Sequence, residues 1–158
     1  MINFLPNWLE VLIMAAVPVV ELRGAIPYGI LALDMSILQT FILSYVGSLI
    51  PAPFILLFVK KILEYMSTSK VAFFRRIAEK LNNKGTKKIA EMKKTTFWGL
   101  TLFIAIPLPG TGVWTGCLVA ALLGMRFKYS MGAAVLGTLI AGIVVTAIVA
   151  SGAHIFGL

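Results

Sequence analysis

Glu21 and Arg23 are the residues whose types and spacing point most directly to chemistry. They place a carboxylate and a guanidinium two residues apart in apolar sequence. The nearest charges along the chain are Glu10 upstream and Asp34 downstream, and Lys60 comes next. An ionisable side chain left unpaired at membrane depth is costly, so such residues usually pair, face a cavity and serve a function. We therefore expect a functional site around these two residues.

Gly24, Pro27 and Gly29 follow within the same motif and favour a broken helix beside the charges. Arg23 offers five donors in a planar fork that suits a phosphate or a carboxylate, and nearby helix N-termini would add backbone N–H groups. Glu21 is the candidate for proton coupling. Two alternatives stay open: a permanent Glu21–Arg23 bridge that only locks the fold, and a pair that lies at the lipid headgroups as an anchor.

A second break interrupts the apolar sequence after Ile106 and ends at Gly112. It contains Pro, Gly and Thr but no charge, and we expect it to form the wall opposite Glu21 and Arg23. A plain tight turn is the alternative. The predicted substrate-binding residues are Glu21, Arg23, Gly24, Pro27, Pro107, Pro109, Gly110, Thr111 and Gly112.

The composition indicates an integral membrane protein. Hydrophobic residues make up 59% of the 158 residues and charged residues 13%, against about 25% charged in a soluble domain. One Cys, Cys117, and one His, His154, allow no internal disulfide and no metal site with ordinary ligand spacing. No nucleotide-binding loop or nucleophile elbow is present, so we expect no enzyme activity, no catalytic residue and no cofactor. Residues 1–158 should form a single transmembrane domain.

Four apolar segments are too short to span a bilayer as single helices. They are Pro6–Val20, Ala25–Leu33, Thr96–Ile106 and Val113–Met125, and the first is only about 22 Å long as a helix, against a hydrocarbon core of roughly 30 Å. Each pair surrounds one of the two breaks, which favours two re-entrant hairpins. Two ordinary tilted helices joined by a loop remain the alternative.

Two longer segments, Ser36–Val59 and Tyr129–Phe156, should each span the membrane. Between them, Lys60–Lys94 holds eleven Lys or Arg and three Glu, a net charge of +8 that equals the charge of the whole chain. A basic, amphipathic segment beside a span is typical of one that lies on anionic lipids. The positive-inside rule places it in the cytoplasm, and nucleic acid is the weaker partner for it.

The two halves resemble each other after a shift of 90 residues. Gly47-Ser48-Leu49-Ile50 then lies on Gly137-Thr138-Leu139-Ile140, and a row of small residues in each span coincides. Because the two spans must cross in opposite senses, we expect inverted repeats, one at about 6–59 and the other at about 96–156, joined by the basic segment at about 60–95. The fold class is therefore an all-α integral membrane protein with two inverted repeats, each a re-entrant hairpin and one full transmembrane helix.

The protein should lie in the cell membrane, that is, the inner or cytoplasmic membrane. This arrangement puts both termini on the outer side of that membrane and the basic segment in the cytoplasm. One chain has little protein with which to cover two broken turns, so we expect a homodimer. The candidate contact is a small-residue face with Gly132, Gly137 and Gly142.

Glu21-Leu-Arg-Gly-Ala-Ile-Pro-Tyr-Gly29, the basic centre and Ile106-Pro-Leu-Pro-Gly-Thr-Gly112 resemble the small multidrug export protein family. That family is similar in layout to the DedA group of membrane proteins. The resemblance covers nearly the whole chain. It implies paired re-entrant hairpins and transport of an amphipathic or lipid-like substrate.

The function predicted from these observations is transport of an amphipathic or anionic lipid-like substrate, such as a drug-like compound or a polyprenyl-phosphate or phospholipid, through facing hairpins. Protons are a candidate coupling partner through Glu21, and the bilayer and its anionic lipids are the surroundings. The alternative is a membrane factor that transports nothing and recruits lipids or partner proteins through its basic segment.

Overall fold

The computed structural model describes residues 5–67, 93–108 and 110–156, and all regular structure in them is helical. The predicted all-α class is therefore confirmed for these residues. In chain order the elements are α1 (Asn7–Ala16), α2 (Glu21–Pro27), a π-helical turn η1 (Tyr28–Ala32), α3 (Ile37–Leu49), α4 (Pro51–Ser67), α6 (Lys93–Ala105), α7 (Val113–Leu122) and α8 (Phe127–Phe156).

Two stretches of helix are long and apolar enough to cross a membrane. They are Ile37–Val59, where α3 continues into α4, and Phe127–Gly152 in α8. With 23 and 26 residues they measure roughly 35 and 39 Å, more than the hydrocarbon core. The helix of the first span is interrupted at Ile50, because Pro51 has no N–H to continue the helical ladder. Large apolar side chains such as those of Leu38 and Phe54 are exposed along it, as lipid contact requires.

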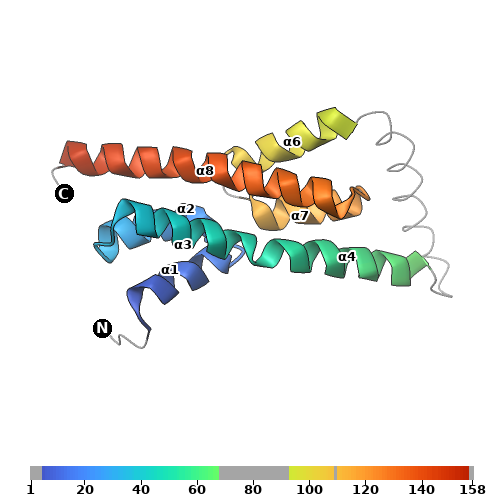
Figure 1. The fold of residues 1–158 in the computed structure, drawn as a ribbon, viewed down its shortest axis with the longest axis horizontal. Helices are drawn as coiled ribbons and strands as arrows, with labels where there is room; N and C mark the ends of the chain where they lie inside the picture. The colour runs from blue at the N-terminus through green and yellow to red at the C-terminus, as the bar shows by residue number, and fades with distance from the viewer. Residues whose placement is uncertain (1–4, 68–92, 109, 157–158) are drawn as a thin grey trace.

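The long helices form the frame on which the short ones pack. Figure 1 shows α3–α4 and α8 side by side and running in opposite directions. The first helix pair, α1 and α2, lies toward one end of this frame, where α1 packs on α3 while α2 packs on α3 and α8. The second helix pair, α6 and α7, lies toward the other end, where α6 packs on α8 and α7 on α4. The turns of the two pairs come together near the middle.

The charged motif starts a helix, which corrects the prediction that it would form the turn between two segments. The second apolar segment was expected from Ala25, but α2 already begins at Glu21, and the turn is Val17–Val20. Pro18 fits a turn better than a helix interior, and a carboxylate is favoured at a helix N-terminus.

Pro27 does not end the helix either. It has no N–H for the α-helical ladder, and the chain continues as the wider turn η1, in which the Leu33 N–H donates to Tyr28 O at 3.2 Å. The predicted break at Pro27 and Gly29 is thus a change of helical pitch, and the turn to α3 follows only after Ala32.

The predicted rows of small residues are buried in both spans, as expected. In the first span they are Thr40, Ser44, Ser48 and Ala52, and in the second Ser130, Ala134, Thr138 and Gly142. The Ser48 hydroxyl donates to Ala15 O at 3.1 Å, which joins α3 to the end of α1. Small side chains on these faces let the short helices approach the long ones closely.

The glycines named as a dimer contact already pack within one chain, which corrects that assignment. A Cβ on Gly137 would meet Ile104 of α6, and a Cβ on Gly142 would meet Phe41 of α3. Gly132 lies near the ring of Phe97. Dimer formation itself stays a prediction, but the buried Gly137 and Gly142 do not provide its surface in this conformation.

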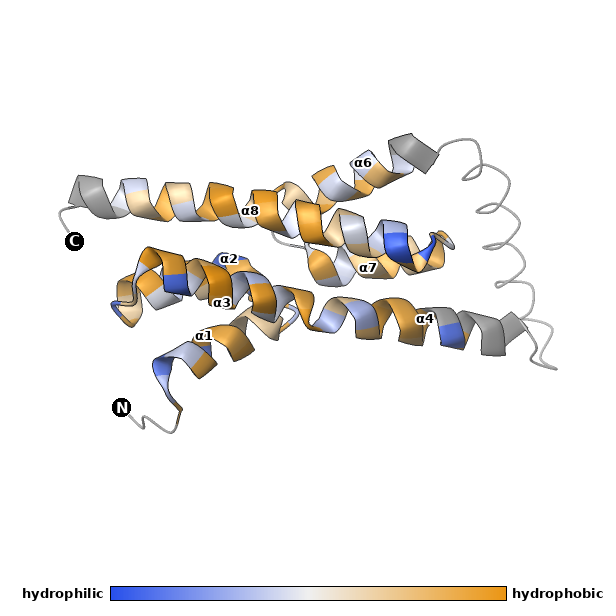
Figure 2. Cartoon of the chain, in the orientation of Figure 1, coloured by the Kyte–Doolittle hydropathy of each residue, from blue (hydrophilic) through white to orange (hydrophobic). Residues whose placement is uncertain are grey.

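The predicted basic segment lies largely outside the described residues. Its first residues continue α4, while residues 68–92, which carry most of its charge, are not described. The exposed cations Lys61, Arg126 and Lys128 lie where α4 nears its end and α8 begins. Figure 2 shows hydrophilic colour at this end of the molecule and apolar colour along the middle of α3, α4 and α8.

Candidate functional site

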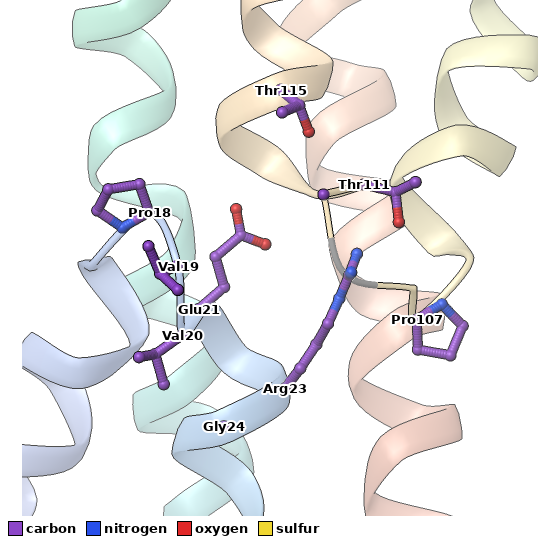
Figure 3. A pocket seen from close by; sticks show the side chains of 10 residues that line it. Pro18, Val19, Val20, Glu21, Arg23, Gly24, Pro107, Thr111 and Thr115 are labelled. Atoms are coloured by element: carbon purple, nitrogen blue, oxygen red, sulfur yellow. The ribbon is translucent and has the colours of Figure 1, made fainter.

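A cleft of about 340 Å³ lies where the turns of the two helix pairs meet. The first turn is Val17–Val20 and the second turn is Ile106–Gly112. Figure 3 shows the side chains of Glu21 and Arg23 pointing from the start of α2 toward the second turn. The cleft is lined by Pro18, Val19, Val20, Glu21, Arg23, Gly24, Pro107, Gly110, Thr111 and Thr115.

The carboxylate of Glu21 caps the N-terminus of α7. Its side chain is 5% exposed, and Oε1 accepts a hydrogen bond from the Trp114 backbone N–H at 3.2 Å. The residue that precedes α7 is Gly112, which has no side chain to cap the helix itself. A carboxylate from the other helix pair therefore satisfies one of the free N–H groups at this helix end and suits its positive dipole.

Gly112 is required by this contact rather than by its backbone angles. Its φ of 166° is extended and open to any residue. A Cβ at this position would overlap the Glu21 carboxylate, so only glycine lets the second turn and the start of α2 approach so closely. Glu21 itself has a φ of 48°, in the left-handed region that non-glycine residues rarely adopt. That conformation costs on the order of 1 kcal/mol, which the capping contact offsets.

The guanidinium of Arg23 binds the second turn through one of its nitrogens. Nη1 donates to Leu108 O, an oxygen that also accepts the Thr111 hydroxyl at 2.8 Å. Nε and Nη2 are buried and have no hydrogen-bond partner in the structure. These two donors lie on the same edge of the guanidinium, so Arg23 presents an unused fork beside the cleft.

Within the described residues, no ion pair joins Glu21 to Arg23, because each side chain reaches the main chain of the second helix pair. A permanent bridge between them is therefore not the arrangement found. The two charges connect the helix pairs across the cleft, together with the Trp114 indole N–H, which donates to Ala16 O at 3.1 Å.

The structure brings most of the predicted site residues together. Glu21, Arg23, Gly24, Pro107, Gly110 and Thr111 line the cleft, and Gly112 lies against the Glu21 carboxylate. Pro27 is the last residue of α2 before η1 and is not among the lining residues, and Pro109 lies outside the described residues. Whether these residues bind a substrate stays a prediction.

Sequence reasoning missed Thr115 and the first turn, Pro18 to Val20, as parts of the cleft. The signal for the first turn is Pro18 itself, because a proline fits a turn better than a helix interior. No sequence feature marked Thr115. It lines the cleft because it follows Trp114 in the first turn of α7.

The sequence profile of one family, described as "Putative small multi-drug export protein", matches residues 21–144. The match begins at Glu21 and includes the cleft residues of α2 and of the second helix pair, whereas the first turn precedes it. No match was found among curated proteins or among solved structures. The similarity of layout to the DedA group stays a prediction. The match covers most of the chain, and together with the two apolar spans it shows that this membrane protein belongs to the small multi-drug export protein family.

Proposed function

We propose that this protein transports an amphipathic or anionic lipid-like substrate across the membrane, through the cleft between its two helix pairs. The observation that carries the proposal is the unused fork of Arg23, with two buried donors beside a cleft of about 340 Å³. A buried donor without a partner is costly, and a phosphate or carboxylate would satisfy both donors at once.

The rim of the cleft supports an amphipathic substrate. Val19 is 90% exposed on the first turn, and Leu108 is 56% exposed on the second. A ligand with a charged head on Arg23 would therefore find apolar contacts for its tail at both turns. Three classes of compound have this combination of a charged head and an apolar tail. They are the amphipathic drug-like compounds that the family description suggests, phospholipids and polyprenyl phosphates.

We further propose that the helix pairs are re-entrant hairpins. α1 has ten residues, and α6 and α7 have 13 and ten. Their lengths of about 15 to 20 Å fall short of the hydrocarbon core. Non-helical turns at membrane depth are tolerated when they line a protein cavity, and the first and second turns line this cleft.

Several matched positions support inverted repeats. The two long apolar helices begin at Ile37 and Phe127, 90 residues apart. A left-handed residue precedes each of them, Asp34 with a φ of 51° and Gly124 with a φ of 66°, again 90 residues apart. Repeats related in this way commonly meet at a substrate site near the midplane.

The remaining parts of the proposal concern coupling, orientation and assembly. Glu21 would carry the coupling proton, because it is the buried carboxylate of the cleft. The basic segment would face the cytoplasm and both termini the outside. The protein would act as a homodimer through a surface other than Gly137 and Gly142, and native mass spectrometry from nanodiscs would test this directly.

Transport is tested in proteoliposomes that carry a fluorescent phospholipid with an anionic headgroup, whose flipping is followed by bleaching with dithionite. We expect the parent protein to accelerate flipping, and Arg23→Gln and Glu21→Gln to abolish the acceleration. Arg126→Gln is the matched control, because Arg126 is exposed and lies outside the cleft. Equal transport by Arg23→Gln and the parent would contradict the site.

The alternative function makes the opposite prediction. If the protein only recruits partners through its basic segment, a complementation assay would tolerate changes in the cleft. It would then fail when the charges between Lys70 and Lys94 are removed.

A further inference from the structure

We propose that the Glu21 carboxylate is a built-in competitor of the substrate: an oxyanion headgroup binds the free edge of Arg23 and displaces Glu21 from the N-terminus of α7. This inference rests on the proposed function, since it concerns the same cleft, and it names the headgroup chemistry and the group that opposes its binding. The ligand class is an alkyl or acyl-chain phosphate, in which two oxygens can accept both donors of the guanidinium edge.

Two of the three Arg23 nitrogens have no acceptor among the residues that the structure describes. Nη1 is used by Leu108 O, whereas Nε and Nη2 are buried without partners. The Thr111 hydroxyl is not a partner of either nitrogen: it lies 2.8 Å from both Ile106 O and Leu108 O, and its one proton is shared between these two carbonyls. A two-oxygen anion is the ligand that fits an unoccupied guanidinium edge of this kind.

Glu21 itself occupies the other anion-binding group of the cleft, the N-terminus of α7. Its Oε1 accepts from Trp114 N–H, and its carboxylate lies directly against Gly112. Glu21 and Arg23 both line the cleft. A second anion on Arg23 would be repelled by the Glu21 carboxylate and attracted by the helix N-terminus that this carboxylate covers.

The Glu21 contact with α7 is weak enough to be released. Oε1 accepts the Trp114 backbone N–H at 3.2 Å, at the long end of the usual range for such a hydrogen bond. Displacement of this carboxylate by a ligand therefore costs less than the loss of a shorter cap would.

Binding is measured on the purified protein in a neutral detergent, through the fluorescence of Trp114. The chain has three tryptophans, and Trp8 and Trp98 are exposed at 52% and 60%. Replacing both with Phe leaves Trp114, whose backbone N–H contacts Glu21, as the reporter. The probe is dodecyl phosphate, with dodecyl trimethylammonium as the probe of opposite charge and inorganic phosphate as the probe without a tail.

We expect saturable binding of dodecyl phosphate and none of the cationic probe. Arg23→Gln should weaken binding by at least about tenfold, while Glu21→Gln, which keeps the shape but removes the charge, should strengthen it by about tenfold. Glu21→Ala should also strengthen it, which covers the case that the Gln variant does not fold. Asp34→Asn and Arg126→Gln remove an exposed acid and an exposed cation elsewhere, and should leave the affinity unchanged.

Weaker or equal binding by both folded Glu21 variants would overturn the competitor role. The absence of a saturable Trp114 response in the parent protein, or an equal response in Arg23→Gln, would overturn the headgroup site. Inorganic phosphate that binds as tightly as dodecyl phosphate would show a free oxyanion rather than a lipid headgroup as the source. Because the assay needs no transport, binding without flipping would contradict the proposed function and leave this inference standing.

Discussion

The two helix pairs bring opposite chemistry to the cleft. The first contributes charged side chains, Glu21 and Arg23, and the second contributes main chain, the Trp114 N–H and the Leu108 C=O. The carboxylate meets the donor and the guanidinium meets the acceptor. A turn without charged residues can therefore be a full partner in a site, because its backbone carries the complementary groups.

The two helix pairs, by contrast, pack on the long helices in the same way, through glycines at equivalent positions. Substitution of these glycines tests the similarity and has the largest expected effect. A Cβ on Gly47 would meet Leu12 O at 2.5 Å, and a Cβ on Gly137 would meet Thr101 O at 2.8 Å. We expect Gly47→Ala and Gly137→Ala each to lower the free energy of unfolding by about 2 kcal/mol. The measurement is an unfolding titration with SDS in mixed micelles.

Gly99→Ala is the control for this experiment, because a Cβ there would meet open space. It should not destabilise the protein, since alanine favours a helix over glycine. If only one of the two buried glycines proves sensitive, the two halves do not pack alike, and the argument for repeats is weakened.

The contact between side chain and main chain across the cleft is tested by Gly112→Ala. The added Cβ would overlap the Glu21 carboxylate, so we expect a loss of about 1–2 kcal/mol of stability. In a Glu21→Ala background the same substitution should cost almost nothing, because the carboxylate is gone. A double-mutant cycle measures this coupling, and additive effects would show that Gly112 serves some other contact.

The left-handed conformation of Glu21 predicts an order between two substitutions. Both Glu21→Ala and Glu21→Gly remove the cap of α7, but glycine adopts a φ of 48° without strain. We expect the Gly variant to be more stable than the Ala variant by about 1 kcal/mol in the same titration. The reverse order would mean that residue 21 relaxes to a right-handed conformation once the carboxylate is lost.

The smallest expected effect concerns the third contact between the pairs. Trp114→Phe removes the hydrogen bond from the indole N–H to Ala16 O and should cost about 0.5–1 kcal/mol. Trp98→Phe is the matched control, because that side chain is exposed. If Trp114→Phe lowers the free energy of unfolding no more than the control does, this hydrogen bond contributes little to the contact between the helix pairs.

Much of this arrangement could be predicted from the sequence because its signals are local. Uninterrupted apolar stretches marked the two long spans, and Ser or Thr every four residues marked the buried face of α3. Charges in apolar sequence and clustered Gly and Pro marked the residues of the cleft. Each of these features depends on residues within a few turns of one another.

The partners of the charged residues could not be predicted, because they depend on contacts far apart in the chain. The hydrogen bonds of Glu21 and Arg23 join residues separated by 93 and 85 positions. A composition of Gly, Pro and Thr does not say which main-chain group will face an incoming side chain. The start of α2 at Glu21 was missed for the same reason, since the carboxylate at this helix end contacts α7, which is far away along the chain.

The proposed inverted repeats require that the two helix pairs enter the membrane from opposite faces and meet at the cleft. Asp34 and Arg126 are exposed residues that precede α3 and α8, the starts of the two long helices. In a Cys117→Ala background, Asp34→Cys should react with an impermeant thiol reagent from outside the cell. Arg126→Cys should react only after the membrane is opened. Reaction of both cysteines from the same face would contradict the inverted repeats and the transport pathway built on them.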